Sequence, residues 1–525
     1  MGYWSKPQMD RDQMVLISTT LSDRIPEDHS VRLFWELLET YDWTGWEAHY
    51  CGCHGQPAIH PRIVAGVLLY GLTQGIRSSR RLEWACGHAV DFMWLAEGRT
   101  IDHSTLCEFR VRFGDELKDL FRHLGRLALS MGVVRLNHVA IDGTRVAASS
   151  SRHGTRGVGS IEAELAFLDE RLASMLAEAE QVDRRESANL FGEDASPVTS
   201  VGAELASLES RQKKLKQALS QLKARQASGS SQKKVAMADP EAPVVPNKDG
   251  GFRPNYTPVV ASDSAQRYVL VETVQADEGE GKALLPLLDE IAEGYGQPAQ
   301  TGSADSAYST PENLERLAGH PTEMYVAPSG ERLEGQRATP VASPNVAQRD
   351  DPRQAVPEAC WKDLPRTKGG RLAQEAFLYD ALSDYYWCPM GQRLALRRVE
   401  RERRDGRIQQ RRVYLCASCG GCRLREGCAG RKRYRQVRAR SVEPWREKMR
   451  AKVYSEQGRA MYRQRQYVAE SPFGLIKTVM GVRQFLLRGW QRVQSEWRWI
   501  CTAYDLRILV RWVARQRQRL ATAAL

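Results

Sequence analysis

Acidic residues at the ends of predicted secondary-structure elements are the first candidates for chemistry in this sequence. Asp142 directly follows residues 139–141 (VAI), a short β-prone run that predicts a buried strand. Asp305 lies shortly before Thr310-Pro311, where a hydroxyl residue ahead of proline predicts a helix start. Carboxylates that converge from distant positions can hold two Mg²⁺ ions about 3.5–4 Å apart, which clamp the attacking and leaving oxygens of an in-line displacement. Spacing alone does not select such a set from 64 acidic residues.

A cluster of cysteines is the second candidate for chemistry. Five of the 11 cysteines lie between Cys388 and Cys428, and three of these follow the spacing Cys416-x-x-Cys419-x-x-Cys422. Four thiolates bind Zn²⁺ tetrahedrally, and a Cys-x-x-Cys knuckle supplies two of them. We predict a structural zinc site in preference to reduced, unmetallated thiols or a redox role, with five candidates for four places.

The charge of the chain favours a polyanionic partner. Lys and Arg total 76 against 64 Asp and Glu, so the net charge is +12, and the excess clusters over residues 393–465 with aromatic residues interleaved. That composition suits phosphates and unstacked bases, although a solvated helical face is the simpler alternative. Since no apolar run is long enough to span a membrane and the N-terminus lacks a signal-peptide core, we expect a cytoplasmic protein with no membrane partner.

The elements that position these residues divide the chain into several structural units. Leucines at helical spacing, among them Leu117, Leu120 and Leu124, predict a helical N-terminal domain, and long amphipathic repeats after residue 158 predict an inserted helical hairpin. Strands at 256–261 and 268–274, followed by a helix, predict a mixed α/β core. The predicted segments are 1–135, the N-terminal helical domain; 136–157, the first part of the core; 158–228, the hairpin; 229–251, a flexible linker; 252–330, the second part of the core; 331–440, an irregular or β-rich Cys-rich insertion; and 441–525, basic C-terminal helices.

The segment 462–477, YRQRQYVAESPFGLIK, resembles the C-terminal signature of DDE transposases of bacterial insertion sequences. In that family a Tyr, an Arg, the catalytic Glu and a Lys recur in this order on a helical segment. Glu470 and Lys477 are seven residues apart, about two helical turns, so they would share one helix face. Other parts of the chain are similar to the same family, namely residues 140–144, 304–308, 481–485, 487–489 with Glu496, and 101–106 with Phe109-Arg110.

The resemblance implies an RNase H-like core, a mixed five-stranded sheet flanked by helices, in an α/β protein. It implies that Asp142, Asp305 and Glu470 are catalytic and hold two Mg²⁺ ions, for which Mn²⁺ can substitute. The implied DNA-binding residues are Tyr462, Arg465, Lys477, Arg483 and Arg488 near the active site and Arg110 and Arg112 in the N-terminal domain, where an ordinary surface helix is the alternative.

The resemblance also implies a zinc ligand set. Related transposases often have a cysteine before Pro-x-Gly, then a Cys-x-x-Cys pair and a further cysteine six residues on. That pattern fits Cys388, Cys419, Cys422 and Cys428, with Cys416 as the spare or an alternative ligand.

The function implied is Mg²⁺-dependent cleavage of a mobile element's ends and strand transfer to target DNA. The partners are double-stranded DNA, as terminal inverted repeats and as target, and a second copy of the chain, because two ends need simultaneous capture. The alternatives are a catalytically inactive, transposase-derived DNA-binding protein and a repair nuclease that cuts without joining. Ser306-Ala307 and Ala469 depart from the family's usual residues, but neither departure removes a ligand.

Overall fold

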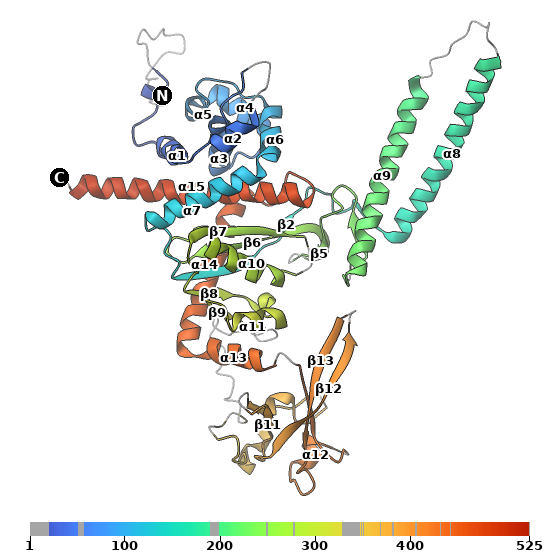
Figure 1. The fold of residues 1–525 in the computed structure, drawn as a ribbon, viewed down its shortest axis with the longest axis vertical. Helices are drawn as coiled ribbons and strands as arrows, with labels where there is room; N and C mark the ends of the chain where they lie inside the picture. Colours follow the sequence, from blue (N-terminus) through green and yellow to red (C-terminus); the bar gives the residue numbers. More distant parts are fainter. Residues whose placement is uncertain are drawn as a thin grey trace, which may run out of the picture.

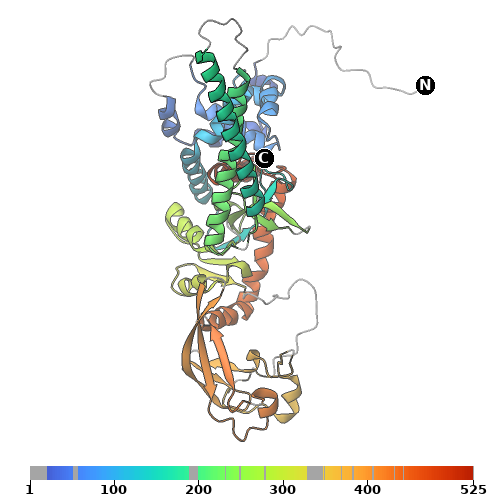
Figure 2. The same ribbon diagram turned by 90° about the vertical axis from the view of Figure 1, so that its right-hand side faces the viewer.

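The computed structural model describes most of the chain and shows an elongated molecule. It describes residues 20–50, 57–188, 199–230, 232–247, 250–276, 279–327, 347, 349, 351–367, 369–380, 383–404, 407–430, 432–440 and 443–523. The N-terminal helices lie at one end, a mixed sheet lies in the middle and a second sheet lies at the other end (Figure 1). A quarter turn about the long axis shows the same order of parts (Figure 2).

The central mixed sheet places its strands in the order β7, β6, β1, β8, β9. These strands are β1 (His138–Gly143), β6 (Phe252–Asp263), β7 (Val269–Gln275), β8 (Thr301–Ala304) and β9 (Glu323–Val326). Strand β6 runs antiparallel to β1 and β7, whereas β1, β8 and β9 run parallel. The predicted mixed sheet is thus confirmed, but it has seven strands rather than five, because β6 also pairs with the short strands β2 (Val146–Ala147) and β5 (Val244–Pro246).

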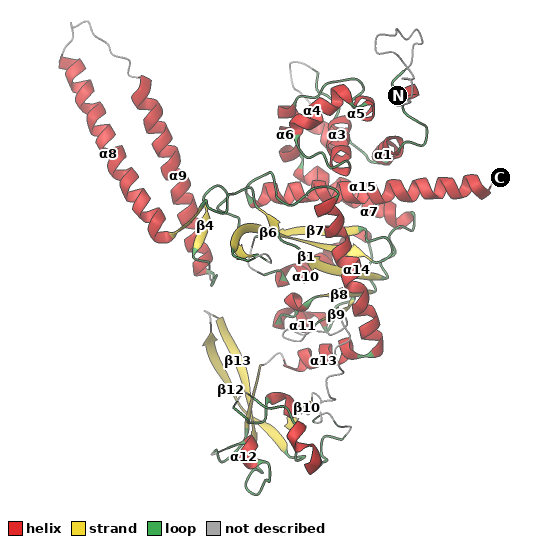
Figure 3. Cartoon of the chain, turned by 180° about the vertical axis from the view of Figure 1, so that it is seen from behind, coloured by secondary structure: helices red, strands yellow, loops and turns green. Residues whose placement is uncertain are grey.

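Successive residues of each strand point to opposite faces of the sheet, and helices pack against these side chains. In β1, Ala140 packs against Val468 and Ala469, whereas Val139 and Ile141 join the main core. The helices and turns around the sheet are η3 (Gly281–Ala283), α10 (Leu284–Tyr295), η4 (Ser306–Tyr308), α11 (Pro311–Leu317), α13 (Glu443–Tyr454), α14 (Glu456–Thr478) and α15 (Trp490–Ala523). Figure 3 shows α13, α14 and α15 from behind.

The N-terminal helices share their core with the C-terminal helix. Trp46 stacks on Phe113 with ring centroids 4.8 Å apart, and the edge of Trp46 meets Trp499 of α15 at 6.2 Å. All three side chains are buried in one cluster with the central sheet. The segments here are η1 (Ser22–Arg24), α1 (Ser30–Glu39), α2 (Thr44–Glu47), η2 (Ala48–Tyr50), α3 (Pro61–Thr73), α4 (Ser79–His88), α5 (Val90–Leu95), α6 (His103–Arg112) and α7 (Gly114–Ser130). The predicted helices are there, but they are completed by a helix from the other end of the chain.

The predicted helical hairpin is present as α8 (Val158–Ala188) and α9 (Thr199–Ala227). It has its own apolar seam, in which Ile161 and Leu168 meet Leu215 and Leu222. The two helices project from the side of the molecule in Figure 1. At their base β3 (Thr155–Gly157) pairs with β4 (Lys234–Ala236), which brings the two connections to the hairpin together.

The prediction of a flexible linker over residues 229–251 is wrong for the residues that the structure describes. Two strands, β4 and β5, form there, and Val235 is buried. Asp239 is also buried, and its carboxylate accepts hydrogen bonds from the Tyr256 hydroxyl at 3.0 Å and from the Gly489 amide at 3.1 Å. A composition of Ser, Lys, Pro and Ala did not reveal the contact with Gly489 or the pairing of β4 with β3, because both partners lie far away in the sequence.

The Cys-rich segment forms a second, antiparallel sheet with a separate core. Its strands are β10 (Leu378–Asp380), β11 (Tyr385–Trp387), β12 (Arg393–Arg404), β13 (Arg407–Cys416) and β14 (Gln436–Arg440), and its helical segments are η5 (Glu358–Asp363), η6 (Gln374–Ala376) and α12 (Arg425–Cys428). The expected β-rich insertion is therefore a small module of its own, which we call the thiol module. Within the described residues, no helix combines the length and apolar character needed to cross a bilayer.

Candidate active site

The two predicted aspartates lie side by side at one edge of the central sheet. Strands β1 and β8 are parallel and pair Ile141 with Ala304. The next residues, Asp142 near the end of β1 and Asp305 directly after β8, therefore lie side by side. The Ala307 amide donates to Asp305 Oδ1 at 2.8 Å and thereby fixes that carboxylate at the start of η4. Parallel neighbours deliver the side chains that follow them to one edge of a sheet, which is why two acids far apart in sequence meet here.

Helix α14 brings the third predicted acid to the same edge. Val468 and Ala469 bury their side chains against Ala140 of β1, and Glu470 follows them on the exposed side. Gln466 Nε2 donates to Glu470 Oε2 at 3.3 Å. The charge of Glu470 acts on Asp142, so the structure places all three predicted acids in one region, although their oxygens do not all lie within 4.8 Å of one another.

The burial of Asp142 and the charges around it are typical of a site that binds a cation. Burial raises the pKa of Asp142 to about 6, Arg465 opposes this, and Asp305 and Glu470 raise it further. Arg465 Nη1 lies 3.5 Å from Asp142 Oδ2 and is the nearest compensating charge that the structure gives this carboxylate. Partly buried carboxylates that repel one another are stabilised by a cation, and their oxygens are the donors that Mg²⁺ and Mn²⁺ prefer, so the residues present fit a divalent metal.

Two other predicted residues of α14 face the same region. The guanidinium of Arg465 lies over the ring of Tyr462 at 5.5 Å, and burial raises the pKa of Tyr462. Lys477 Nζ donates to Thr144 Oγ1 at 2.5 Å and to the Arg145 carbonyl at 3.1 Å, in the turn that follows Asp142. Lys477 therefore lies next to the turn after Asp142, and Arg465 contacts Asp142 itself. The predicted contacts of Lys477 and Arg465 with phosphate stay predictions.

The remaining predicted DNA-binding arginines differ in how exposed their side chains are. Arg112, Arg483 and Arg488 are exposed, and Arg488 Nε donates to the Ser149 carbonyl at 2.9 Å. Arg110 is instead largely enclosed, and burial lowers its pKa against the opposing charge of Glu496. DNA contact stays a prediction for all four, and the placement of Arg110 favours a structural role.

A fourth carboxylate at this edge was not predicted. Glu280 precedes η3, and burial raises its pKa to about 7, with Asp305 and Asp142 adding to the rise. The sequence around it is polar and resembles any surface loop. The one signal available was Gly143, because a glycine directly after a candidate catalytic aspartate permits a close approach by another group.

The five predicted zinc ligands are gathered in the thiol module. Cys388, Cys416, Cys419, Cys422 and Cys428 line one small cavity. Backbone amides donate to two of the sulfurs, from Gln392 to Cys388 at 3.3 Å and from Arg435 to Cys419 at 3.5 Å. A hydrogen bond with Cys416 lowers the pKa of Cys388 to about 6. Thiolates with N–H donors fit a structural zinc ion, and because Cys416 contacts Cys388 the choice between them stays open.

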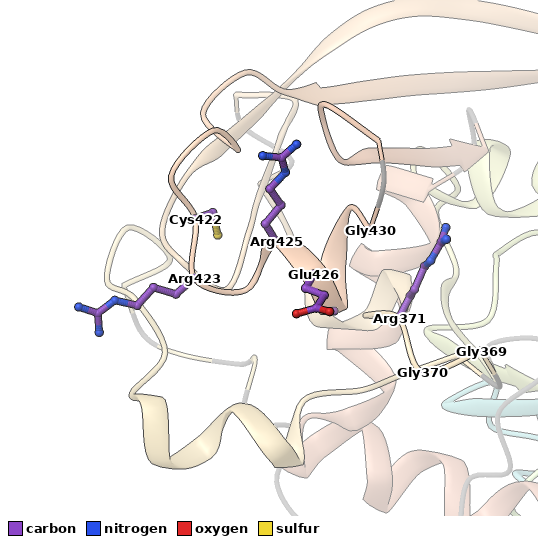
Figure 4. Close-up of a pocket in the computed structure, with 9 residues that line it drawn as sticks. Gly369, Gly370, Arg371, Cys422, Arg423, Arg425, Glu426 and Gly430 are labelled. Atoms are coloured by element: carbon purple, nitrogen blue, oxygen red, sulfur yellow. The ribbon is translucent and has the colours of Figure 1, made fainter.

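Two other features of the described residues could suggest a ligand. Ligand atoms of Glu83, Asp102 and His103 lie within 4.8 Å of one another, but His103 already pairs with both acids, at 2.9 and 3.5 Å. An open pocket of about 820 Å³ in the thiol module is bordered by Arg371 and Arg425 (Figure 4). This pocket belongs to a different module from the carboxylates, so the active site is identified by its acids rather than by a deep cavity.

Two protein families match this chain. Residues 19–112 match a transposase domain of the DUF772 family, which covers helices α1 to α6. Residues 387–510 match a transposase DDE domain, which covers the cysteines, α14 with Glu470, and most of α15. No curated protein and no solved structure matches the chain significantly. The DDE-domain match includes Glu470 but neither aspartate, so Asp142 and Asp305 rest on the geometry of the sheet.

Proposed function

Because the chain belongs to the DDE transposases of the insertion-sequence type, we propose that it cuts the ends of its own mobile element and joins them to target DNA. The observation that carries this proposal is the meeting of Asp142 and Asp305 at the ends of two parallel strands, with Glu470 on the helix packed across them. The RNase H-like class of the core follows from the DDE-domain match and agrees with the mixed sheet.

Asp142, Asp305 and Glu470 would hold two Mg²⁺ ions, with Mn²⁺ as a substitute. When bound, these ions activate the attacking oxygen and stabilise the leaving oxygen. Glu470 is exposed and accepts a hydrogen bond from the exposed Gln466, so its side chain can turn toward the aspartates without disturbing the core. Arg465 keeps Asp142 ionised before the metal arrives.

Basic side chains around the acids would hold the DNA. Lys477 is anchored at the turn after Asp142, where a scissile phosphate would lie, and Tyr462 orients Arg465 beside it. The exposed Arg112, Arg483 and Arg488 would contact phosphates further along the duplex. A homodimer would hold both element ends, bound to the nucleoid in the cytoplasm, and a zinc ion in the thiol module would be structural.

The test is cleavage of DNA that carries the repeats flanking the gene, in Mg²⁺, by the wild type, Asp142→Asn and Glu470→Gln. Glu293→Gln, an exposed position on α10, is the matched control. We expect the wild type and the control to cut at the element ends and form joined products, while the two active-site variants bind the DNA normally and cut about 100-fold less or not at all.

Two results would contradict the proposal. If every protein binds the ends and none cuts, the chain is a DNA-binding derivative. If the wild type cuts but never joins the ends to a second DNA, it is a nuclease.

A further inference from the structure

Glu280 reaches the catalytic edge from an element that the predicted triad does not use. It lies between the end of β7 and the start of α10, and its carboxylate approaches the backbone just after Asp142. A Cβ atom added to Gly143 would lie 2.6 Å from Glu280 Oε2 and 3.1 Å from Oε1. A larger side chain at position 143 would force the Glu280 carboxylate to move, so the glycine permits the position that this carboxylate takes.

The position of Glu280 is fixed by contacts with the Asp305 segment. The Tyr308 hydroxyl donates to Glu280 Oε2 at 3.4 Å. The buried Asn313 donates through Nδ2 to the Gly281 carbonyl at 2.7 Å and to the Tyr308 carbonyl at 2.9 Å. Asn313 thereby ties the backbone beside Glu280 to the turn that follows Asp305. Such a buried polar network restricts the positions of the groups that it joins.

The charges that act on Glu280 are mostly of its own sign. Asp305 and Asp142 repel it, and Arg145 is the cation that opposes them. Arg465 is paired with Asp142. A carboxylate that is partly buried beside two others destabilises the fold unless a cation joins them, so the network around Glu280 serves a purpose other than stability.

We infer that Glu280 is a fourth carboxylate of the metal site and binds the divalent ion held by Asp142 and Asp305, directly or through one bound water. The inference rests on the proposed function, because it concerns the same ions. Tyr308 is then a positioning residue, since it contacts Glu280 and not the ion.

The test is Mn²⁺ binding without DNA, measured by calorimetry and by the electron paramagnetic resonance signal of the bound ion. The proteins are the wild type, Glu280→Gln, Tyr308→Phe, Asp142→Asn and the control Glu293→Gln. Glu280→Gln keeps the size of the side chain, and circular dichroism checks that each variant is folded. We expect Glu280→Gln to weaken Mn²⁺ binding by about 10-fold or more, Tyr308→Phe to weaken it less, and Glu293→Gln to leave it unchanged.

The outcomes separate this inference from the proposed function. If Asp142→Asn loses Mn²⁺ and Glu280→Gln binds it as the wild type does, the metal site stands and the role of Glu280 is refuted. If the wild type itself binds no Mn²⁺, or Asp142→Asn binds it unchanged, the metal site fails and the inference fails with it. If Glu280→Gln alters cleavage but not Mn²⁺ binding or its resonance signal, Glu280 acts on the DNA and not on the ion.

Discussion

Asp142 is held in a charged state that the metal-free fold does not favour. Burial and two neighbouring acids raise its pKa to about 6 from an ordinary value of 3.8, although Arg465 lies 3.5 Å away. Below pH 3.8 the carboxyl is protonated in both the folded and the unfolded chain. Between 3.8 and 6 the folded chain holds the proton more tightly, so the free energy of unfolding falls as pH rises, and above 6 that stability is lost.

The fall in the free energy of unfolding with rising pH gives a prediction for Asp142→Asn in the presence of a chelator. We expect the variant to be more stable than the wild type by roughly 2–3 kcal/mol at pH 8, and the gap to shrink toward zero as pH falls to about 4. Urea unfolding followed by fluorescence at both pH values measures the gap. Asp28→Asn, at an exposed position ahead of α1, should show no such change. A gap that is the same at both pH values would mean that repulsion at Asp142 is not its source.

Sequence reasoning found the three acids but not the fourth, and the reason is physical. Asp142 and Asp305 each follow a strand, and Glu470 lies in a family signature, so local sequence marks them. Glu280 lies in a polar loop, and its significance comes from contacts with Gly143 and Tyr308, which lie elsewhere in the chain. Contacts between distant residues leave no local pattern to read.

At the scale of elements, the thiol module differs from the central sheet in what holds it together. Its apolar cluster is separate from the main core, and the cysteines form a large part of it. A small core of this kind normally needs a metal or a covalent link, and every cysteine that the structure describes is a free thiol. Zinc would therefore be a structural part of this module.

We predict about one zinc ion per purified chain, measured by plasma mass spectrometry. Cys422→Ser should lose most of the zinc and lower the melting temperature of the thiol module, whereas Cys107→Ser, at an exposed thiol of α6, should lose none. Comparing Cys388→Ser with Cys416→Ser decides which of the two is the fourth ligand. A wild-type chain without zinc would refute the site.

At the scale of the whole molecule, the hairpin of α8 and α9 packs mainly on itself. Its seam is its own, and the paired strands β3 and β4 close its base. The hairpin was predictable because leucines at helical spacing indicate it, whereas β4 was missed because it pairs with β3, which is distant in sequence. Strand β5 was missed although its partner, the start of β6, follows it closely in the chain.

Deletion of residues 158–227 should therefore leave a folded protein. Residues 228–233 would then connect β3 to β4, and the costs would be exposure of Val235 and loss of the hydrogen bonds that Arg225 donates to the carbonyls of Glu241 and Ala242. We expect a loss of about 1–2 kcal/mol and a melting temperature lower by roughly 2–6 °C, measured by calorimetry. Loss of a cooperative transition would show that the hairpin is part of the main fold. Light scattering on the same protein tests whether the hairpin joins two copies.

Because the N-terminal helices share their core with α15, the time needed for translation delays their final packing. Trp46 and Phe113 are completed by Trp499, which the ribosome adds long after Phe113. At roughly 5–20 residues per second, the N-terminal helices wait about 20–80 s for that partner. A nascent chain that does not yet include Trp499 therefore lacks a finished N-terminal half, and that half is completed only after Asp142, Asp305 and Glu470 have all been synthesised.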